Sequence, residues 1–330
     1  MVLEQPAPIE QAPLSLRDVP LPTPAERQIR VAVTVCGICH TDLHTVEGEL
    51  SLPKLPIIPG HQIVGVVEAR GGLVRKFRNG DRVGIPWLHR TDGICQFCLS
   101  GQENLCNGAE FTGLHANGGY AGYTLIDEDF AYALPRTFDD LHAAPLLCAG
   151  IIGYRSFRLS RARPGDRLGL YGFGASAHIV LQFARHLGCE VYVYSRGQPH
   201  RDMAMRMGAV WAGDAAEDAG AKLDSAILFA PAGPLVHLAL RALRKGGTLA
   251  LAGITMTPVP QLDYSLLYEE RVVRSVANST RQDAREFLEL AAEVPIHTEV
   301  TEFALEDANV ALQQLKAGSI NGAGVLRVPR

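Results

Sequence analysis

The sequence predicts an α/β plus β protein of two domains: an irregular, barrel-like and mainly antiparallel domain, and a doubly wound parallel sheet. The chain has 330 residues, which is more than one ordinary hydrophobic core needs. Short strand-like segments separated by Gly and Pro fill the first part of the chain. From about residue 150, strand and helix patterns alternate, as they do in βαβ units.

Composition and charge narrow the class of protein. Hydrophobic residues make up 47% of the chain and charged residues 20%, as in a globular protein. The net charge of -4 gives no basic footprint for nucleic acid. No run of apolar residues is long enough for a membrane span, and the segment from Met1 to Pro6 lacks the features of a secretory signal. We therefore expect a cytoplasmic protein that binds neither nucleic acid nor membrane.

Alternating or continuous apolar residues locate the strands of the first domain. Residues 29–35 alternate apolar and polar side chains, as in a half-buried strand. Residues 59–69 indicate a second strand, and residues 80–85 indicate a turn that enters a third. Frequent Gly and Pro between such short strands favour a barrel-like arrangement over a flat sheet.

The second domain begins with a strand, a glycine-rich turn and a helix. Residues 167–171 are apolar and lead into Gly172-Phe-Gly-Ala-Ser-Ala177, after which a helical stretch from His178 stops at Gly188. The next strand is residues 190–194. Further strands are predicted at residues 226–229, 248–251 and 272–276, with helices at residues 235–243 and 283–293, the last with Thr280 as N-cap.

Three residues far apart in the sequence carry soft metal ligands. Cys39 and His61 suit Zn²⁺, and Cys148 supplies the third ligand that a catalytic site with one open position needs. Cys148 alone could be a buried core residue. The pair Cys36 and Cys39 could instead be a redox CxxC motif, although the Val-rich strand before it and the His-Thr-Asp after it do not match a thioredoxin-like context.

A second cluster of cysteines indicates a structural metal. Cys95, Cys98 and Cys106 have the spacing of a closed zinc lobe, and seven cysteines with two CxxC pairs favour metal over disulfides. Asp92 lies three residues before Cys95, and a carboxylate oxygen can ligate zinc. The alternative is a lobe without metal in which Asp92 is a turn residue.

The glycine-rich turn predicts a dinucleotide site of the Rossmann type. Gly172 and Gly174 allow a tight turn and a close approach of the pyrophosphate to the helix that begins at Ala175-Ser176. The second strand ends in Ser195-Arg196 where an NAD enzyme carries an acid, and the loss of repulsion together with the guanidinium favours NADP. The alternative is that Arg196 stacks on adenine and NAD still binds.

The motifs Gly37–His44, Pro59–His61 and Leu147–Gly150 are similar in order and spacing to those of zinc-dependent alcohol dehydrogenases of the medium-chain dehydrogenase/reductase superfamily. The resemblance covers essentially the whole chain. It implies a GroES-like catalytic zinc-binding domain of residues 1–149 and 292–330, and a Rossmann domain of residues 150–291.

The resemblance also implies residue roles. Cys39, His61 and Cys148 would bind the catalytic zinc that polarises the substrate oxygen, and Asp42 would hydrogen-bond the ligand imidazole. Hydride would pass reversibly between an alcohol and NAD(P). The remaining roles are a proton relay through Thr41, the cofactor ribose and His44, a pyrophosphate contact at His40, a nicotinamide contact at Ala252-Gly253-Ile254, and a substrate pocket with Trp87 and Leu50.

Some positions depart from the family pattern or have ordinary alternatives. Gln62 replaces the Glu that usually follows the ligand His, and Ala323 follows Gly322 where an Arg is common. His44 could be an ordinary surface His, and Trp87 could be core packing. By analogy with related enzymes we expect a homo-oligomer, either a dimer or a tetramer.

Two rival functions remain at this stage. A zinc polyol dehydrogenase commonly places a carboxylate near the third ligand position, where this chain has Cys148. A non-catalytic, NADP-sensing member of the family would account for Gln62, Asp92 and Ala323, but not for the pair Thr41 and His44. A zinc-free quinone reductase is excluded if the three ligands hold metal.

Overall fold

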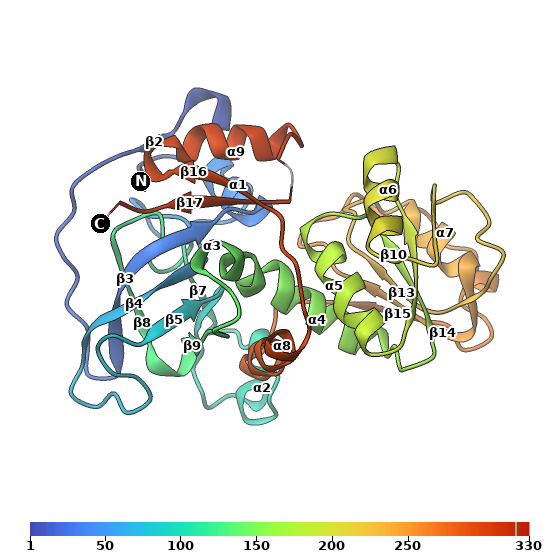
Figure 1. The fold of residues 1–330 in the computed structure, drawn as a ribbon, viewed down its shortest axis with the longest axis horizontal. Helices are drawn as coiled ribbons and strands as arrows, with labels where there is room; N and C mark the ends of the chain where they lie inside the picture. The colour runs from blue at the N-terminus through green and yellow to red at the C-terminus, as the bar shows by residue number, and fades with distance from the viewer. Residues whose placement is uncertain (321, 330) are drawn as a thin grey trace. The chain divides into compact units, whose positions relative to one another are not determined.

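Two sheets organise the chain (Figure 1), and the computed structural model describes residues 1–320 and 322–329. The residues fall into two compact units. The first contains residues 1–148, 279–292 and 297–330, and the second contains residues 149–278 and 293–296.

The first unit is built on one sheet of seven strands. In order across the sheet they are β16 (Val300–Ala304), β17 (Ala323–Arg327), β3 (Gln28–Gly37), β4 (Gln62–Arg70), β5 (Arg82–Ile85) and β9 (Tyr132–Ala133), with β8 (Tyr123–Asp127) also paired to β3. All of these pairs are antiparallel except β16 with β17. The side chains of Ile29, Val31, Val33 and Val35 point into the core in alternation, as the sequence predicts.

Short elements complete this unit. The strand pairs are β1 (Val2–Leu3) with β2 (Leu14–Ser15), and β6 (Leu88–Arg90) with β7 (Glu110–Phe111). The helices are α1 (His40–Glu47), α2 (Gln96–Leu99), α3 (Asp140–Ala143), α8 (Arg281–Glu293) and α9 (Ala308–Lys316). Turns of 3-10 helix lie at Ile9–Gln11, Glu103–Leu105, Glu128–Phe130, Ala144–Leu147 and Leu305–Asp307.

The second unit is a doubly wound parallel sheet, as predicted. Its strands run in the order β12 (Trp211–Gly213), β11 (Glu190–Tyr194), β10 (Arg167–Tyr171), β13 (Leu223–Leu228), β14 (Leu243–Leu251) and β15 (Val272–Ser275). Every neighbouring pair is parallel. The chain runs outward in one direction from β10 to β12 and in the other from β13 to β15, so the order reverses between β10 and β13. Ligands of such sheets bind at this reversal, beyond the carboxyl ends of the strands.

Helices cover this sheet. They are α4 (Ala149–Ser160), α5 (Ala175–His186), α6 (Gln198–Arg206) and α7 (Leu235–Ala242), and a 3-10 turn lies at Tyr264–Leu266. Val236, Ala239 and Leu240 of α7 pack on the sheet face that carries Tyr171 and Tyr194. The two tyrosine rings stack with their centroids 4.2 Å apart.

One segment lies in a different unit from the one that the sequence suggested. Residues 279–291, predicted in the dinucleotide-binding domain, group with the first unit. The reason is an ion pair: the buried Glu103 carboxylate accepts hydrogen bonds from the Arg281 backbone N–H at 2.9 Å and from its Nε at 3.1 Å. The Arg281 guanidinium also lies over the Phe130 ring. Thr280 caps this helix as predicted, because its hydroxyl accepts from the Asp283 N–H at 3.1 Å.

No helix of the described residues combines the length and the apolar character that crossing a bilayer requires.

Candidate metal centres and nucleotide-binding turn

Three separate segments of the first unit bring Cys39, His61 and Cys148 together. Cys39 is the N-cap of α1, His61 directly precedes β4, and Cys148 follows the 3-10 turn Ala144–Leu147. The Cys39 sulfur accepts from the Thr41 N–H at 3.3 Å. The local sequence favours this arrangement because Cys39 and Asp42 form a reciprocal capping box that starts the helix at the metal ligand.

The spacing of the three ligand atoms fits a tetrahedral ion. His61 Nε2 lies 3.3 Å from the Cys39 sulfur and 3.4 Å from the Cys148 sulfur, and the two sulfurs are 4.0 Å apart. Ordinary Zn–S and Zn–N bond lengths in a tetrahedron require about 3.6 Å between sulfur and nitrogen and about 3.8 Å between the sulfurs. Two sulfurs and one imidazole are also the donor set of a catalytic zinc site with one open position.

A buried carboxylate fixes the orientation of the His61 ring. Asp42 Oδ1 lies 2.9 Å from His61 Nδ1 and accepts from the Gly60 N–H at 3.2 Å, while Oδ2 accepts from the Cys39 N–H at 2.9 Å. An ionised carboxylate only accepts, so Nδ1 carries a proton, and Nε2 is the ring atom that points at the two sulfurs and could ligate a metal. The Asp42 carboxylate therefore hydrogen-bonds the side chain of one candidate ligand, His61, and the backbone N–H of another, Cys39.

The electrostatics of the cluster favour a cation. The pKa of Cys39 lies well below its usual range, chiefly because the Cys148 thiol donates a hydrogen bond to its sulfur. The same bond, together with burial, holds the pKa of Cys148 well above its usual range. Burial alone would lower the pKa of His61, but the charges of Asp42 and Cys39 outweigh it and raise that pKa. The three groups thus share protons that a divalent cation would displace on binding.

Aromatic rings line one side of the cluster. The Trp87 ring meets the His61 ring edge-on, with centroids 4.9 Å apart. Phe111 of β7 stacks on Trp87 with ring centroids 5.0 Å apart, and the His115 ring meets Phe111 edge-on with centroids 5.5 Å apart. Sequence reasoning found Trp87 and missed Phe111, which follows the cysteine lobe and has no motif of its own.

The proton-relay candidates share helix α1. Thr41 and His44 are three residues apart and therefore lie on one face of the helix. His44 Nδ1 lies 2.5 Å from Glu49 Oε2, a contact that sequence reasoning missed. Gly48 ends the helix with φ of 76°, which turns the chain back so that the Glu49 N–H donates to the His44 carbonyl at 2.9 Å.

The other two predicted residues of this region lie beside the relay. The rings of His40 and His44 are 6.4 Å apart. Leu50 is partly buried, and its N–H approaches the same His44 carbonyl at 3.4 Å. Gln62 is buried at the start of β4, and its side chain lies against Gly37.

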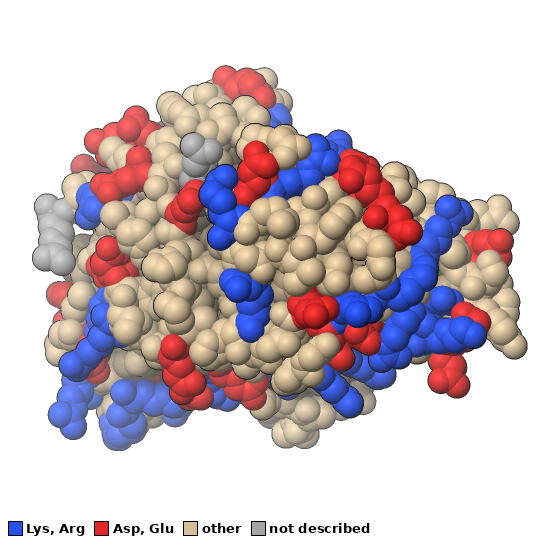
Figure 2. All heavy atoms as spheres, turned by 45° about the vertical axis from the view of Figure 1, so that its right-hand side comes forward, with Lys and Arg blue, Asp and Glu red and all other residues tan. Residues whose placement is uncertain are grey.

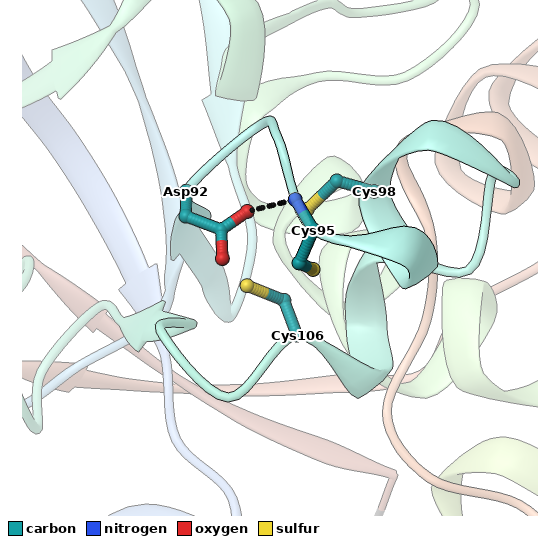
Figure 3. A group of neighbouring side chains, drawn as sticks. All are labelled: Asp92, Cys95, Cys98 and Cys106. Atoms are coloured by element: carbon teal, nitrogen blue, oxygen red, sulfur yellow. Dashed lines mark hydrogen bonds between the residues drawn. The ribbon is translucent and has the colours of Figure 1, made fainter.

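The second cluster brings Asp92, Cys95, Cys98 and Cys106 within ligand distance of one another, with their candidate ligand atoms no more than 4.8 Å apart. Asp92 Oδ1 accepts from the N–H groups of Ile94 and Cys95, each at 2.9 Å. Figure 3 shows this bond to Cys95, and the other carboxylate oxygen and the sulfurs turned toward a common space. These backbone bonds, followed by the Cys106 thiol, hold the pKa of Asp92 well below its usual range. One ionised oxygen and three sulfurs suit a closed zinc site.

The glycine-rich turn has the geometry of an anion site. Gly172 has φ of 89°, and a Cβ there would lie 2.9 Å from the Ala230 nitrogen, so only glycine fits. Gly174 is the N-cap of α5, and the space where a Cβ would lie is open. Ala175 and Ser176 form the first helical turn, whose N–H groups have no partner inside the helix.

The remaining cofactor candidates lie at the carboxyl ends of the strands. Ser195 is buried directly after β11, whereas Arg196 is exposed. Arg201 of α6 lies 3.5 Å from Glu217. Ala252-Gly253-Ile254 follows β14, and the Ala252 N–H donates to the Leu228 carbonyl at 2.9 Å. The residues predicted to bind the pyrophosphate, the adenosine ribose and the nicotinamide therefore all lie at the edge of the sheet formed by the carboxyl ends of its strands.

Comparisons with known proteins agree with this geometry. A family model described as alcohol dehydrogenase GroES-like domain matches residues 25–136, and one described as zinc-binding dehydrogenase matches residues 177–293. A probable alcohol dehydrogenase, AdhA, of Mycobacterium tuberculosis is 47% identical over 99% of this chain and 96% of its own length. The chain belongs to the zinc-dependent alcohol dehydrogenases of the medium-chain dehydrogenase/reductase superfamily.

Solved structures of the family have the same fold. A cinnamyl alcohol dehydrogenase of Sorghum bicolor superposes with a TM-score of 0.87 at 28% identity and covers 94% of this chain and 92% of its own. A Helicobacter pylori enzyme described as CAD, complexed with NADP(H), superposes with a TM-score of 0.81 at 26% identity, covering 92% of this chain and 91% of its own. The predicted fold class and enzyme class are thereby confirmed: the chain is an alcohol dehydrogenase that uses zinc and a nicotinamide cofactor on small-molecule alcohols.

Proposed function

We propose that this enzyme interconverts primary, secondary and aromatic alcohols with their carbonyl compounds, with NADP as preferred cofactor and with Cys39, His61 and Cys148 as ligands of the catalytic zinc. One observation carries the proposal. Two sulfurs and an imidazole nitrogen from three distant segments stand at tetrahedral spacing, and the far side of the imidazole is held by a buried carboxylate.

The residues around this site have distinct tasks. Bound there, zinc supplies Lewis-acid activation of the substrate oxygen. Asp42 keeps Nδ1 of His61 protonated, so Nε2 stays available as a ligand. Trp87 covers the His61 ring and limits the access of water from that side.

The proton released by an alcohol needs a path to solvent, and α1 offers one. Thr41 is buried close to the ligand Cys39, whereas the His44 side chain is 17% exposed. The Glu49 carboxylate accepts from His44 Nδ1, which leaves Nε2 free to accept a proton. Thr41 would carry the proton at the buried end and His44 would pass it to water at the other.

The Asp92 cluster would hold a structural zinc. A closed set of four ligands has no open position for a substrate, so this ion would stabilise the fold only. Two backbone N–H groups fix one oxygen of Asp92, which supports a role for its other oxygen as the fourth ligand.

Cofactor preference depends on the end of β11. Ser195 brings no charge to repel a 2′-phosphate, and the exposed Arg196 guanidinium offers it a bidentate partner. On the face drawn in Figure 2, Lys and Arg side chains, with some Asp and Glu among them, gather toward the right-hand side, and a basic surface suits an anionic dinucleotide. The description of the Helicobacter pylori relative as complexed with NADP(H) supports the same choice.

The stacked pair Trp87 and Phe111 supports aromatic alcohols among the substrates. The two rings stack on each other with centroids 5.0 Å apart beside His61, and both are only partly buried, so the metal site is bordered by an aromatic surface that an aromatic substrate could contact.

We also propose a homo-oligomer in the cytoplasm. Among the described residues β15 is an edge strand, paired on one side only, and Tyr264 and Tyr268 just before it are 71% and 63% exposed. An exposed edge beside apolar side chains is suited to pairing with a second copy. A reducing compartment would keep the cysteines of both clusters as thiols.

Metal analysis and a cofactor comparison test this function. The purified enzyme should contain two zinc ions per chain and produce reduced nicotinamide from alcohols, faster with NADP than with NAD. Cys39→Ala should lose one zinc ion and turnover while keeping its fold; retained activity would contradict the ligand assignment. Arg196→Ala should impair NADP use more than NAD use, whereas Arg206→Ala, an exposed arginine at the far end of α6, should change neither. Equal losses at Arg196 would contradict the NADP assignment.

A further inference from the structure

A glycine-rich segment that the mechanism leaves unused packs against the turn that carries His61. The Gly118 N–H donates to the Ile58 carbonyl at 2.7 Å, and the Gly119 N–H donates to the Gly60 carbonyl at 3.0 Å. The Tyr120 N–H donates to the Pro59 carbonyl at 3.0 Å. Residues 118–120 are therefore bonded, residue by residue, to the three residues before the metal ligand.

The two glycines are needed for this approach. A Cβ at Gly118 would lie 2.0 Å from the Gly60 carbonyl oxygen, and one at Gly119 would lie 2.4 Å from Ile63 and 2.9 Å from the Cys36 sulfur. By contrast, a Cβ at Gly122, two residues beyond Tyr120, would meet nothing within 4 Å. The close packing is confined to the part of the segment that faces the turn.

The Tyr120 ring closes the contact from the other side. Tyr120 is fully buried, and a Cβ at Gly60 would lie 2.4 Å from its Cδ1 atom. Gly60 has φ of 99° and donates its N–H to Asp42. The ring thus packs on the same peptide unit that hydrogen-bonds the carboxylate of the metal site.

The hydroxyl of Tyr120 and the carboxylate of Asp42 can each form one more hydrogen bond. The hydroxyl is buried and makes no hydrogen bond of acceptable geometry to any described residue. Asp42 accepts three hydrogen bonds, from His61, Gly60 and Cys39, and a carboxylate can accept about four. Burial, and then the charge of the nearby Asp42, raise the pKa of Tyr120 well above its usual range, so the phenol keeps its proton and can donate it.

We infer that Gly118-Gly119-Tyr120 is a positioning element of the catalytic zinc site, in which the Tyr120 hydroxyl supplies the fourth hydrogen bond to Asp42. A small rotation of the ring or one buried water completes the bond. Tyr120 touches neither substrate nor metal; it acts through Asp42 on His61. The inference depends on the proposed function, because it assumes that Cys39, His61 and Cys148 bind zinc.

Zinc affinity measured on the whole enzyme tests this inference, and the chain contains its own control. Competition with a chromophoric chelator should release two zinc ions per chain in two steps, and Cys39→Ala identifies the catalytic step. Tyr120→Phe keeps the ring and removes only the hydroxyl. It should weaken binding of the catalytic zinc by about tenfold and leave the zinc of the Asp92 cluster within twofold of wild type. Tyr171→Phe removes another buried hydroxyl, in the second unit, that makes no hydrogen bond of acceptable geometry to a described residue, and it should change neither ion.

Each outcome decides between the possibilities. If Tyr120→Phe binds both ions as Tyr171→Phe does, the inference is wrong. If Tyr120→Phe weakens both ions and melts early, Tyr120 has only a general packing role, and the inference is again wrong. A wild-type enzyme with zinc in the Asp92 cluster alone would overturn the proposed function and this inference together. In cobalt-substituted enzyme, Tyr120→Phe should also shift the visible spectrum of the catalytic ion, which packing elsewhere would leave unchanged.

Discussion

Replacement of Asp42 by Asn tests how strongly one buried carboxylate holds the catalytic site. The amide keeps one oxygen and puts an NH₂ group in place of the other. An NH₂ group at the Oδ1 position would put a donor against two other donors, His61 Nδ1–H and the Gly60 N–H. At the Oδ2 position it would face one donor, the Cys39 N–H. The second orientation is therefore the favourable one. His61 then keeps its tautomer, while the capping bond at Cys39 and the negative charge are both lost.

The magnitude follows from those losses. A hydrogen bond to a charged group is worth about 1.5–3 kcal/mol, and loss of an outer partner of a metal ligand costs about 10–100-fold in affinity. We expect Asp42→Asn to weaken binding of the catalytic zinc by about 2 kcal/mol, or roughly thirtyfold. Chelator competition measures this value, with the zinc of the Asp92 cluster as internal reference. Asp263→Asn changes another capping Asp, at a 3-10 turn of the second unit, and should leave both affinities unchanged. Wild-type affinity in Asp42→Asn would refute the reasoning, and so would an equal loss of both ions.

Three further predictions concern the rest of the first unit. Asp92→Ala should bind the structural zinc more weakly and have a lower melting temperature, whereas Asp92→Cys should bind that ion more tightly. Zinc titration and melting curves of the two variants measure these effects. Burial alone would raise the pKa of Glu103, but hydrogen bonds from Arg281 outweigh it and lower that pKa. Ionised Glu103 therefore contributes its full stabilisation above the ordinary pKa of 4.5, and this contribution is lost as the pH falls through the lowered pKa. Glu103→Gln should thus lower the free energy of unfolding at pH 7 and have the same stability as wild type in strong acid. Gly118→Ala should lower the free energy of unfolding by about 1–3 kcal/mol, whereas Gly122→Ala should lower it by less than about 0.5 kcal/mol. If the two variants had similar denaturation midpoints, the close packing at Gly118 would be contradicted.

The sequence predicts the fold class and the metal ligands because both leave local patterns. Alternating apolar residues mark β3, and strands alternating with helices mark the parallel sheet. Cys39, His61 and Cys148 stand out because few other roles require such residues in such motifs. The structure brings their ligand atoms together, which the chain order alone does not show.

The residues that sequence reasoning missed are those whose role depends on a partner elsewhere. Glu49 lies beyond the end of α1 and reaches His44 only because Gly48 turns the chain back. Glu after a helix-ending Gly is a signal that could have found it. Phe111 and Tyr120 are ordinary aromatic residues in the sequence, and only the paired backbone of residues 58–60 and 118–120 shows what Tyr120 touches.

Helix α8 illustrates a different limit. Its amphipathic pattern and its Thr280 cap are visible in the sequence, but the pattern does not say which sheet the apolar face will cover. The deciding contact is the pair of Glu103 and Arg281, whose members are 178 residues apart. Glu103 lies in the cysteine lobe between Cys98 and Cys106, so the proposed structural zinc would also hold the start of this helix.

Two histidines of this chain, His61 and His44, each have a carboxylate against Nδ1, and they differ in how deeply they are buried. In His61 and in His44, a carboxylate oxygen lies against Nδ1, so Nε2 is the ring nitrogen that the proposed roles would use. The side chains of His61 and Asp42 are 1% and 2% exposed, and Nε2 of His61 lies 3.3 and 3.4 Å from the two sulfurs, an arrangement that suits a metal ion. The side chains of His44 and Glu49 are 17% and 52% exposed, so that pair can exchange a proton with water. We therefore propose that a carboxylate–imidazole pair would hold a cation where it is buried and would pass a proton where it reaches solvent.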